Sequence, residues 1–233
     1  MADALNNPQL LLALALGIVP SIFWLLIWIH TDRENPEPLG LLFFCFVLGG
    51  ISVLFATFLQ HGAKDMVTAA TSRIVVYAGI EELVKFGAFY LIAYKNPYND
   101  ETIDPSIYLM AVALGFAALE NIFYVLKPGM SFNITATLLT GGLRFLGSTL
   151  LHTIASCFVG IMIGIMPRKT RFVSIVLGLS GAIFLHATFN FFILKNDTAS
   201  FLQIYGYLWI AAIIIHVTLE KLRRVPMEEV IPV

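Results

Sequence analysis

Charged residues are scarce in this chain. Of its 233 residues only 12% are Asp, Glu, Lys or Arg, whereas 58% are hydrophobic, and the formal net charge is −1. Water-soluble domains carry about twice that charged fraction, so the composition is typical of a polytopic membrane protein. No basic patch interleaved with aromatic residues is present. The sequence therefore gives no indication of nucleic-acid binding.

Cysteine is equally rare. Cys45 and Cys157 both lie inside apolar runs, where we expect reduced and packed side chains rather than a disulfide framework. The N-terminus lacks the basic segment of a signal peptide, and its apolar run is about twenty residues long. We therefore expect this run to remain as the first membrane span.

Long apolar runs recur along the whole chain. Because lipid offers backbone groups no hydrogen-bond partners, each run of about twenty residues is expected to be a helix. The breaks between runs, such as DRENPEP and KNPYNDETIDP, combine proline, asparagine, aspartate and charge, and they leave no room for a soluble domain. We expect one membrane-embedded domain over residues 1–233, an all-α transmembrane bundle of about seven spans at residues 10–29, 39–60, 74–94, 107–126, 143–165, 172–194 and 201–219.

The positive charges predict an orientation for these spans in the cell membrane. Two basic clusters, at residues 168–171 and 221–224, fall on the same side of the membrane if seven spans are correct. The positive-inside rule makes that side cytoplasmic. We therefore expect the N-terminus outside the cell and the C-terminus in the cytoplasm.

Ionisable residues within the predicted spans are few and informative. Glu81, Glu82 and Lys85 lie within one and a half turns of the third span, Glu120 lies in the fourth, and Arg144 begins the fifth. Each such group near the middle of a membrane costs about 2.5–3.5 kcal/mol on insertion scales. We expect these groups to face the bundle interior or a water-filled cavity, to pair with one another and to mark a functional site.

Helical spacing brings the charges of the third span together. Lys85 follows Glu81 by four residues and Glu82 by three, so its ammonium group can pair with either carboxylate on one helix face. Two adjacent carboxylates beside a lysine suit a base that acts on water. Further polar groups that bind water, protons or metal ions occur as Glu120 and Asn121 in the fourth span, Arg144, Ser148 and His152 at successive i+4 steps in the fifth, and His186 and Asn190 one turn apart in the sixth.

Several hydrolytic mechanisms can be excluded by inspection. Aspartyl catalysis within a membrane needs two membrane aspartates, and every Asp of this chain is expected outside the spans. The zinc motif H-E-x-x-H is absent, and Ser148 lacks a G-x-S-x-G elbow, so we interpret Ser148 as a packing residue. A glutamate acting on water remains, with histidine and asparagine stabilising the oxyanion. The residues leave open whether a divalent metal such as zinc takes part, with Glu82, Glu120, His152 and His186 as candidate ligands.

The polar motifs occur in an order that resembles the PrsW family of bacterial intramembrane proteases. The ordered set covers about residues 30–195 and comprises DRENPEP at 32–38, EELVK at 81–85, GFAALENIFY at 115–124, the segment from Arg144 to Gly160, and HATFN at 186–190. This resemblance implies a glutamate-dependent membrane endopeptidase, distantly related to CAAX prenyl-proteases and bacteriocin-processing enzymes. It also implies site roles by motif position: paired catalytic glutamates at Glu81 and Glu82, a second-motif glutamate at Glu120, a catalytic histidine at His152, and an oxyanion or metal-binding role for His186 and Asn190.

The residues and the resemblance together predict hydrolysis of a peptide bond in a single-span membrane protein, with an anti-sigma factor as a candidate substrate. In this hypothesis Glu81 or Glu82 deprotonates a water molecule held with His152. Lys85 and Arg144 then tune or neutralise the carboxylates.

The same residues allow two other interpretations. A proton-coupled transporter also uses buried Glu, His and Arg, but no inverted repeat between the halves of the chain supports it. A haem held between His152 and His186 predicts a Soret band in the purified protein.

Overall fold

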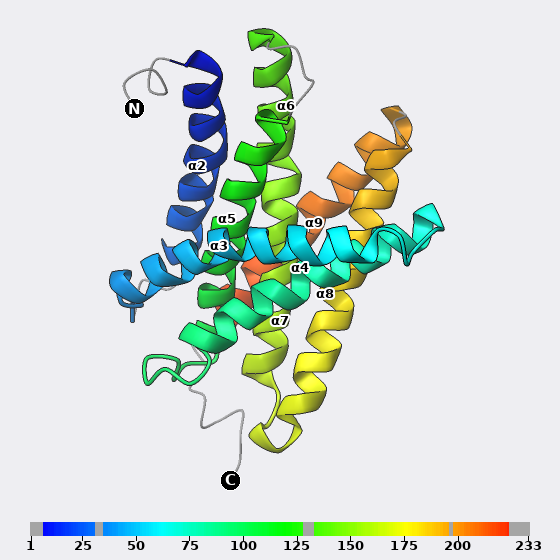
Figure 1. The fold of residues 1–233 in the computed structure, drawn as a ribbon. Helices are drawn as coiled ribbons and strands as arrows, with labels where there is room; N and C mark the ends of the chain where they lie inside the picture. Colours follow the sequence, from blue (N-terminus) through cyan, green and yellow to red (C-terminus); the bar gives the residue numbers. More distant parts are fainter. Residues whose placement is uncertain (1–6, 31–34, 128–132, 196–197, 224–233) are drawn as a thin grey trace.

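The structure is all-helical, as the sequence predicts. The computed structural model describes residues 7–30, 35–127, 133–195 and 198–223, and these residues contain no strand. Figure 1 shows an elongated bundle with α3 and α4 side by side across it. Its elements are α2 (Pro8–Ile29), α3 (Leu39–Ala63), α4 (Ala70–Ile92), α5 (Asp104–Val125), α6 (Ile134–Leu146), α7 (Ser148–Ile165), the short 3₁₀ helix η2 (Arg168–Thr170), α8 (Arg171–Leu194) and α9 (Thr198–Leu222).

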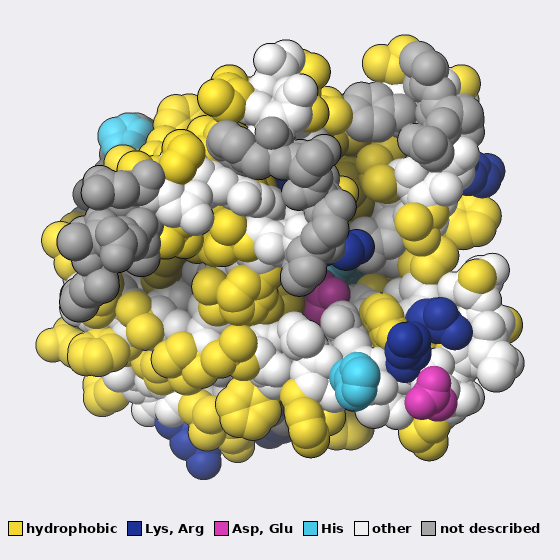
Figure 2. Space-filling model, turned by 45° about the horizontal axis from the view of Figure 1, so that its top comes forward, with side chains coloured by type: hydrophobic (Ala, Val, Ile, Leu, Met, Phe, Trp, Pro, Cys, Tyr) yellow, Lys and Arg dark blue, Asp and Glu magenta, His cyan; other side chains and the backbone are white. Residues whose placement is uncertain are grey.

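Most of these helices are suited to a bilayer. Six helical segments of the described chain are long and apolar enough to cross a membrane, with α6 and α7 counted together as one. The remaining expected span, residues 74–94, is the third in order and coincides with α4, which is long enough but carries Arg73, Glu81, Glu82 and Lys85. Much of the visible surface is hydrophobic (Figure 2), as contact with lipid requires. The chain is a multi-pass membrane protein.

Helix α5 forms the centre of the bundle. It is buried along nearly its whole length and packs mainly against α2, α3 and α7. Glycines allow this close packing, because a Cβ atom on Gly115 would collide with the backbone oxygen of Phe46 in α3. Gly160 and Gly164 of α7 lie directly against the N-terminal end of α5 and the residues before it.

The fifth expected span, residues 143–165, is divided in the structure. Helix α6 ends at Leu146, α7 begins at Ser148, and Gly147 between them has non-helical dihedral angles of φ −120° and ψ −79°. The Tyr205 side chain of α9 packs where a Cβ of residue 147 would lie, and its hydroxyl donates a hydrogen bond of 2.8 Å to the backbone oxygen of Leu143. The break separates Arg144 of α6 from Ser148 and His152 of α7.

The expectation that every Asp lies outside the spans is wrong for Asp104. This residue begins α5 and is fully buried. Its Oδ2 atom accepts hydrogen bonds from the backbone N–H groups of Asp100 and Glu101, which fold the preceding loop around it. Asp65 and Asp100 lie between helices, so the described residues still offer no pair of membrane aspartates.

The loop motif DRENPEP is only partly described. Asp32, Arg33 and Glu34 lie outside the described residues. Glu37 is buried just before α3, and it accepts a hydrogen bond from the hydroxyl of Tyr108 in α5. This contact joins the start of α3 to the central helix.

Candidate active site

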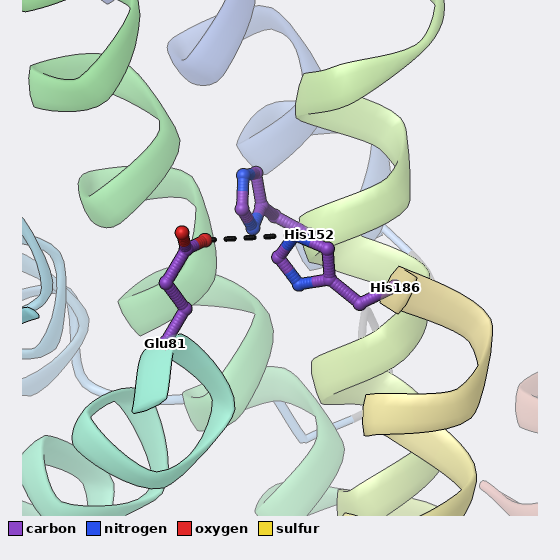
Figure 3. A group of neighbouring side chains, drawn as sticks. All are labelled: Glu81, His152 and His186. Atoms are coloured by element: carbon purple, nitrogen blue, oxygen red, sulfur yellow. Dashed lines mark ion pairs between the residues drawn. The ribbon is translucent and has the colours of Figure 1, made fainter. Parts of the chain in front are cut away.

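Three side chains from three helices converge in the interior of the bundle. Glu81 comes from α4, His152 from α7 and His186 from α8, and they point toward one another (Figure 3). One potential ligand atom from each lies within 4.8 Å of the other two. All three side chains are largely shielded, with exposed fractions of 12%, 1% and 3% in that order.

Glu82 lies beside this group, and one of its carboxylate oxygens contacts two partners. Its Oε1 atom is 2.7 Å from Lys85 Nζ and 2.6 Å from His186 Nδ1. Of the two pairings that the helical spacing allows for Lys85, the structure contains the one with Glu82. Because Nδ1 of His186 contacts Glu82, its other ring nitrogen faces the site, 3.5 Å from Glu81 Oε2.

His152 is held from both sides of its ring. Lys85 Nζ lies 3.2 Å from its Nδ1 atom, and Glu120 Oε2 lies 3.2 Å from its Nε2 atom. If Lys85 is protonated and no ion is bound, Nδ1 accepts a hydrogen bond from Lys85 and Nε2–H donates one to Glu120, and a bound ion would replace one of these two contacts. The buried Lys85 therefore joins the imidazole of α7 to the carboxylate of Glu82 on α4.

Glu120 and Arg144 form the more open part of the site. Arg144 contacts Glu120 Oε2 at 2.6 Å, Asn121 Oδ1 at 2.5 Å and Ser148 Oγ at 3.2 Å. The guanidinium also lies over the ring of Tyr124, 4.4 Å from its centre. The Glu120 side chain is 32% exposed.

Sequence reasoning missed Gln60. This residue near the end of α3 donates a hydrogen bond of 2.8 Å to Glu81 Oε1, which leaves Oε2 as the atom that faces the histidines. An amide at the edge of an apolar span was the available signal. By contrast, Asn190 lies one turn after His186 on α8 but makes no hydrogen bond with the described residues.

The donor set of the converging group fits a divalent metal ion. One carboxylate and two imidazoles with room for a further ligand are the residue types of catalytic zinc sites. Glu81 Oε2 is buried without a hydrogen-bond partner in the described chain. Because buried polar atoms normally have such a partner, this oxygen is available to bind a ligand. Of the candidate ligands that the sequence offers, His152 and His186 belong to this group, whose carboxylate is Glu81, whereas Glu82 and Glu120 contact Lys85 and Arg144.

The local charges also favour a cation. Three carboxylates, on Glu81, Glu82 and Glu120, face two basic side chains, on Lys85 and Arg144. If these five groups are ionised and both histidines are neutral, one negative charge is left over in a setting where unbalanced charge is costly. The contact from Glu82 to His186 has the arrangement of carboxylates that orient metal-bound histidines.

Comparisons with known proteins identify relatives of this chain. A family model described as PrsW family intramembrane metalloprotease matches residues 37–218. The chain is 26% identical to a Protease PrsW from Oceanobacillus iheyensis over 208 residues, which cover 86% of this chain and 92% of that protein. The chain is also 26% identical to the Protease PrsW of Bacillus subtilis over 207 residues, which cover 83% of this chain and 88% of that protein. The match to the Geobacillus kaustophilus protein of the same description has 32% identity over 126 residues, but it spans 53% of this chain and only 56% of that relative. No solved structure matches the chain.

Proposed function

Because the chain belongs to the PrsW family of intramembrane metalloproteases, we propose that it is an endopeptidase that hydrolyses a peptide bond of a membrane-anchored protein. The observation that supports this most directly is the convergence of Glu81, His152 and His186 in the interior of a membrane protein. A single-span protein is the proposed substrate. An anti-sigma factor is one candidate, because the resemblance to the family implies it.

We propose that Glu81 activates the water molecule. Its Oε1 atom is held by Gln60, and its Oε2 atom has no hydrogen-bond partner among the described residues, so Oε2 can accept the proton of a water molecule. The water oxygen would attack the peptide carbonyl, and Glu81 would deliver the proton to the leaving amine. The Nε2–H group of a protonated His186 and the side-chain amide of Asn190 would donate hydrogen bonds to the oxyanion.

The flanking charges act as positioning groups in this mechanism. Glu82 and Lys85 fix the rings of His186 and His152 by direct contact. Arg144 neutralises Glu120, and Glu120 in turn contacts His152 Nε2. A divalent ion held by Glu81, His152 and His186 would give an alternative route, in which the ion polarises the water and the substrate carbonyl and takes the place of Glu81 Oε2 as base and of His186 as oxyanion donor.

The proposed orientation has the N-terminus outside and the C-terminus in the cytoplasm. The connection from α7 to α8, which contains η2, lies at the opposite end of the bundle from the start of α2 (Figure 1). Its cluster Arg168, Lys169 and Arg171 and the cluster ending α9 carry the positive charge that favours a cytoplasmic side. Arg224 of the second cluster lies outside the described residues.

A cleavage assay on purified protein tests the proposed function. The substrates are a panel of purified single-span membrane proteins, anti-sigma factors among them, and each reaction is run with and without a strong chelator. Wild type is compared with Glu81→Gln and with Glu220→Gln, a carboxylate-to-amide change in α9 away from the site. We expect cleavage by wild type and Glu220→Gln and none by Glu81→Gln. Cleavage by Glu81→Gln at the wild-type rate would refute the role of Glu81, and the chelator lanes separate metal-assisted from metal-free hydrolysis.

A further inference from the structure

A groove lies between the first half of α4 and the second half of α8. Its volume is about 450 Å³, within the range of ligand-binding sites of roughly 300–1,000 Å³. Thr71, Ile74 and Val75 line it from α4, and the α8 wall includes Ser180, Ala187 and Thr188. Most of the lining is apolar, but hydroxyl groups occur on both walls.

The groove leads toward the candidate active site. On α4, Thr71 and Ile74 are followed at helical spacing by Ala78 and then by Glu81, which places the carboxylate further along the same side of the helix. On α8, Ala187 of the groove directly follows His186. A molecule in the groove would therefore end about two helical turns short of Glu81 on α4 and would contact the residue next to His186 on α8.

The groove opens toward the membrane rather than toward the core. Its side chains include Val75, which is 48% exposed, and Phe184, which is 70% exposed. Helix α8 is long and apolar enough to cross a bilayer, so exposed apolar side chains at this place face lipid. An occupant can enter sideways from the membrane without passing through water.

The hydroxyl groups of the groove point to a polypeptide rather than an acyl chain. Those of Thr71, Ser180 and Thr188 make no hydrogen bond within the described chain. Other helical threonines do, since the hydroxyls of Thr57 and Thr218 donate to backbone oxygens one turn earlier at 2.9 and 2.8 Å. A lipid tail offers nothing to such donors, whereas an unwound peptide segment has free backbone groups that must be satisfied in the membrane.

We propose that this groove between α4 and α8 binds the membrane-spanning segment of the protein substrate beside the cleavage site. The inference rests on the proposed function and names the substrate-binding surface of the same site. The apolar walls pack against the side chains of the segment. The hydroxyls of Thr71, Ser180 and Thr188 bind backbone groups where the segment unwinds, because a peptide bond within a helix is shielded from attack.

Kinetics with a matched pair of tryptophan variants test this proposal. Ser180→Trp fills the groove, whereas Leu91→Trp places the same side chain on an open face of α4, where Leu91 is 79% exposed. The substrate is the panel member that wild type cleaves best. For Ser180→Trp we expect KM to rise about tenfold or more with an unchanged melting temperature, because binding is blocked while the fold is kept. For Leu91→Trp we expect wild-type kinetics.

A second pair of variants tests the contribution of a groove hydroxyl without changing the volume of the groove. Thr188→Val removes one groove hydroxyl at nearly constant size, and Thr218→Val does the same in α9. We expect only Thr188→Val to lower kcat/KM. Contact is measured with the photoreactive residue p-benzoylphenylalanine at position 180 or 91 in the inactive Glu81→Gln protein, and substrate should be captured from position 180 alone.

The outcomes distinguish the two proposals. Wild-type kinetics for Ser180→Trp, or capture of lipid alone from position 180, would refute the groove as the substrate site while leaving the protease function intact. If wild type cleaves no member of the panel, the proposed function fails, and the groove inference fails with it.

Discussion

His186 Nδ1 on α8 lies 2.6 Å from Glu82 Oε1 on α4, and this contact gives Glu82 surroundings that differ from those of the adjacent Glu81. Oε1 of Glu82 is contacted by both His186 and Lys85, and the Nζ atom of Lys85 lies 2.7 Å from it. Glu81, one residue earlier, points one oxygen toward the histidines with no hydrogen-bond partner in the described chain. Adjacent residues on a helix point about 100° apart, so the proposed base and the glutamate that contacts the imidazole can be neighbours in the sequence.

The two glutamates are expected to fail in different ways when changed to glutamine. Glu81→Gln should remain folded and lose cleavage, because Gln60 can still bond to the amide oxygen of the new side chain. Glu82→Gln should also lose stability, since it leaves the fully buried Lys85 without its counter-charge. Breaking a buried ion pair costs about 3–5 kcal/mol. Thermal unfolding in detergent and the cleavage assay measure the two effects separately.

The double variant Glu82→Gln/Lys85→Met is the control for this explanation. It removes both charges, so most of the lost stability should return while cleavage stays absent. Equal melting temperatures for Glu82→Gln and wild type would show that the contact between Glu82 and Lys85 contributes nothing to folding.

Arg144 should not tolerate replacement by lysine. Its guanidinium reaches Glu120, Asn121 and Ser148 at once and stacks on Tyr124, a geometry that a single ammonium group cannot reproduce. We expect Arg144→Lys to lower the melting temperature and to reduce cleavage by about tenfold or more, because Glu120 loses its fixed position beside His152. Lys195→Arg, at the end of α8, is the reverse exchange outside the site. Activity of Arg144→Lys equal to wild type would mean that charge alone is needed at this position.

Hydropathy was sufficient to predict most of the helices, because the cost of unpaired backbone groups in lipid leaves few alternatives to a helix, but it gave neither the start of α6 at Ile134 nor its separation from α7. The spacing of Glu82 and Lys85 likewise predicted their contact, since both residues belong to one helix turn. These predictions depend on local geometry, which the order of residues determines directly.

Contacts between helices could not be derived in the same way. Nothing in the spacing of α4 indicated that Gln60 of α3 would bond to Glu81, or that Lys85 would reach His152 of α7. The break at Gly147 was also missed, because its partner Tyr205 lies 58 residues later in the chain. Such features follow from tertiary packing, and a single sequence contains no local signal for them.

Close packing of α3 on α5 predicts a strong effect of one methyl group. Gly115→Ala would place a Cβ atom against the backbone oxygen of Phe46, and backbone atoms of two packed helices cannot move aside easily. We expect the variant to be destabilised by about 1–3 kcal/mol or more, as judged by thermal unfolding. Gly87→Ala in α4 is the matched control, because no atom lies within 4 Å of its new Cβ. Equal stability of the two variants would contradict the close contact of α3 with α5.

The last prediction is that the converging group of Glu81, His152 and His186 binds a divalent metal ion. Purified wild-type protein, stripped with chelator and titrated with Zn²⁺ or Co²⁺, should bind about one ion per chain, because Glu81, His152 and His186 form one donor set. His186→Ala should abolish this binding. Glu82→Gln should weaken it by about 10–100-fold, since Glu82 orients the ring of His186 without belonging to the donor set. Metal analysis and the visible spectrum of bound Co²⁺ report the binding independently of any substrate.

His216→Ala separates this site from adventitious binding by histidine. His216 lies in α9 with its ring 5.9 Å from that of Trp28, far along the chain from the converging group and absent from its donor set. This variant should bind the ion as wild type does. If His186→Ala and His216→Ala bind equally, the ion is held elsewhere. Hydrolysis would then have to depend on the carboxylate of Glu81 alone, which the chelator lanes of the cleavage assay would show as activity that survives metal removal.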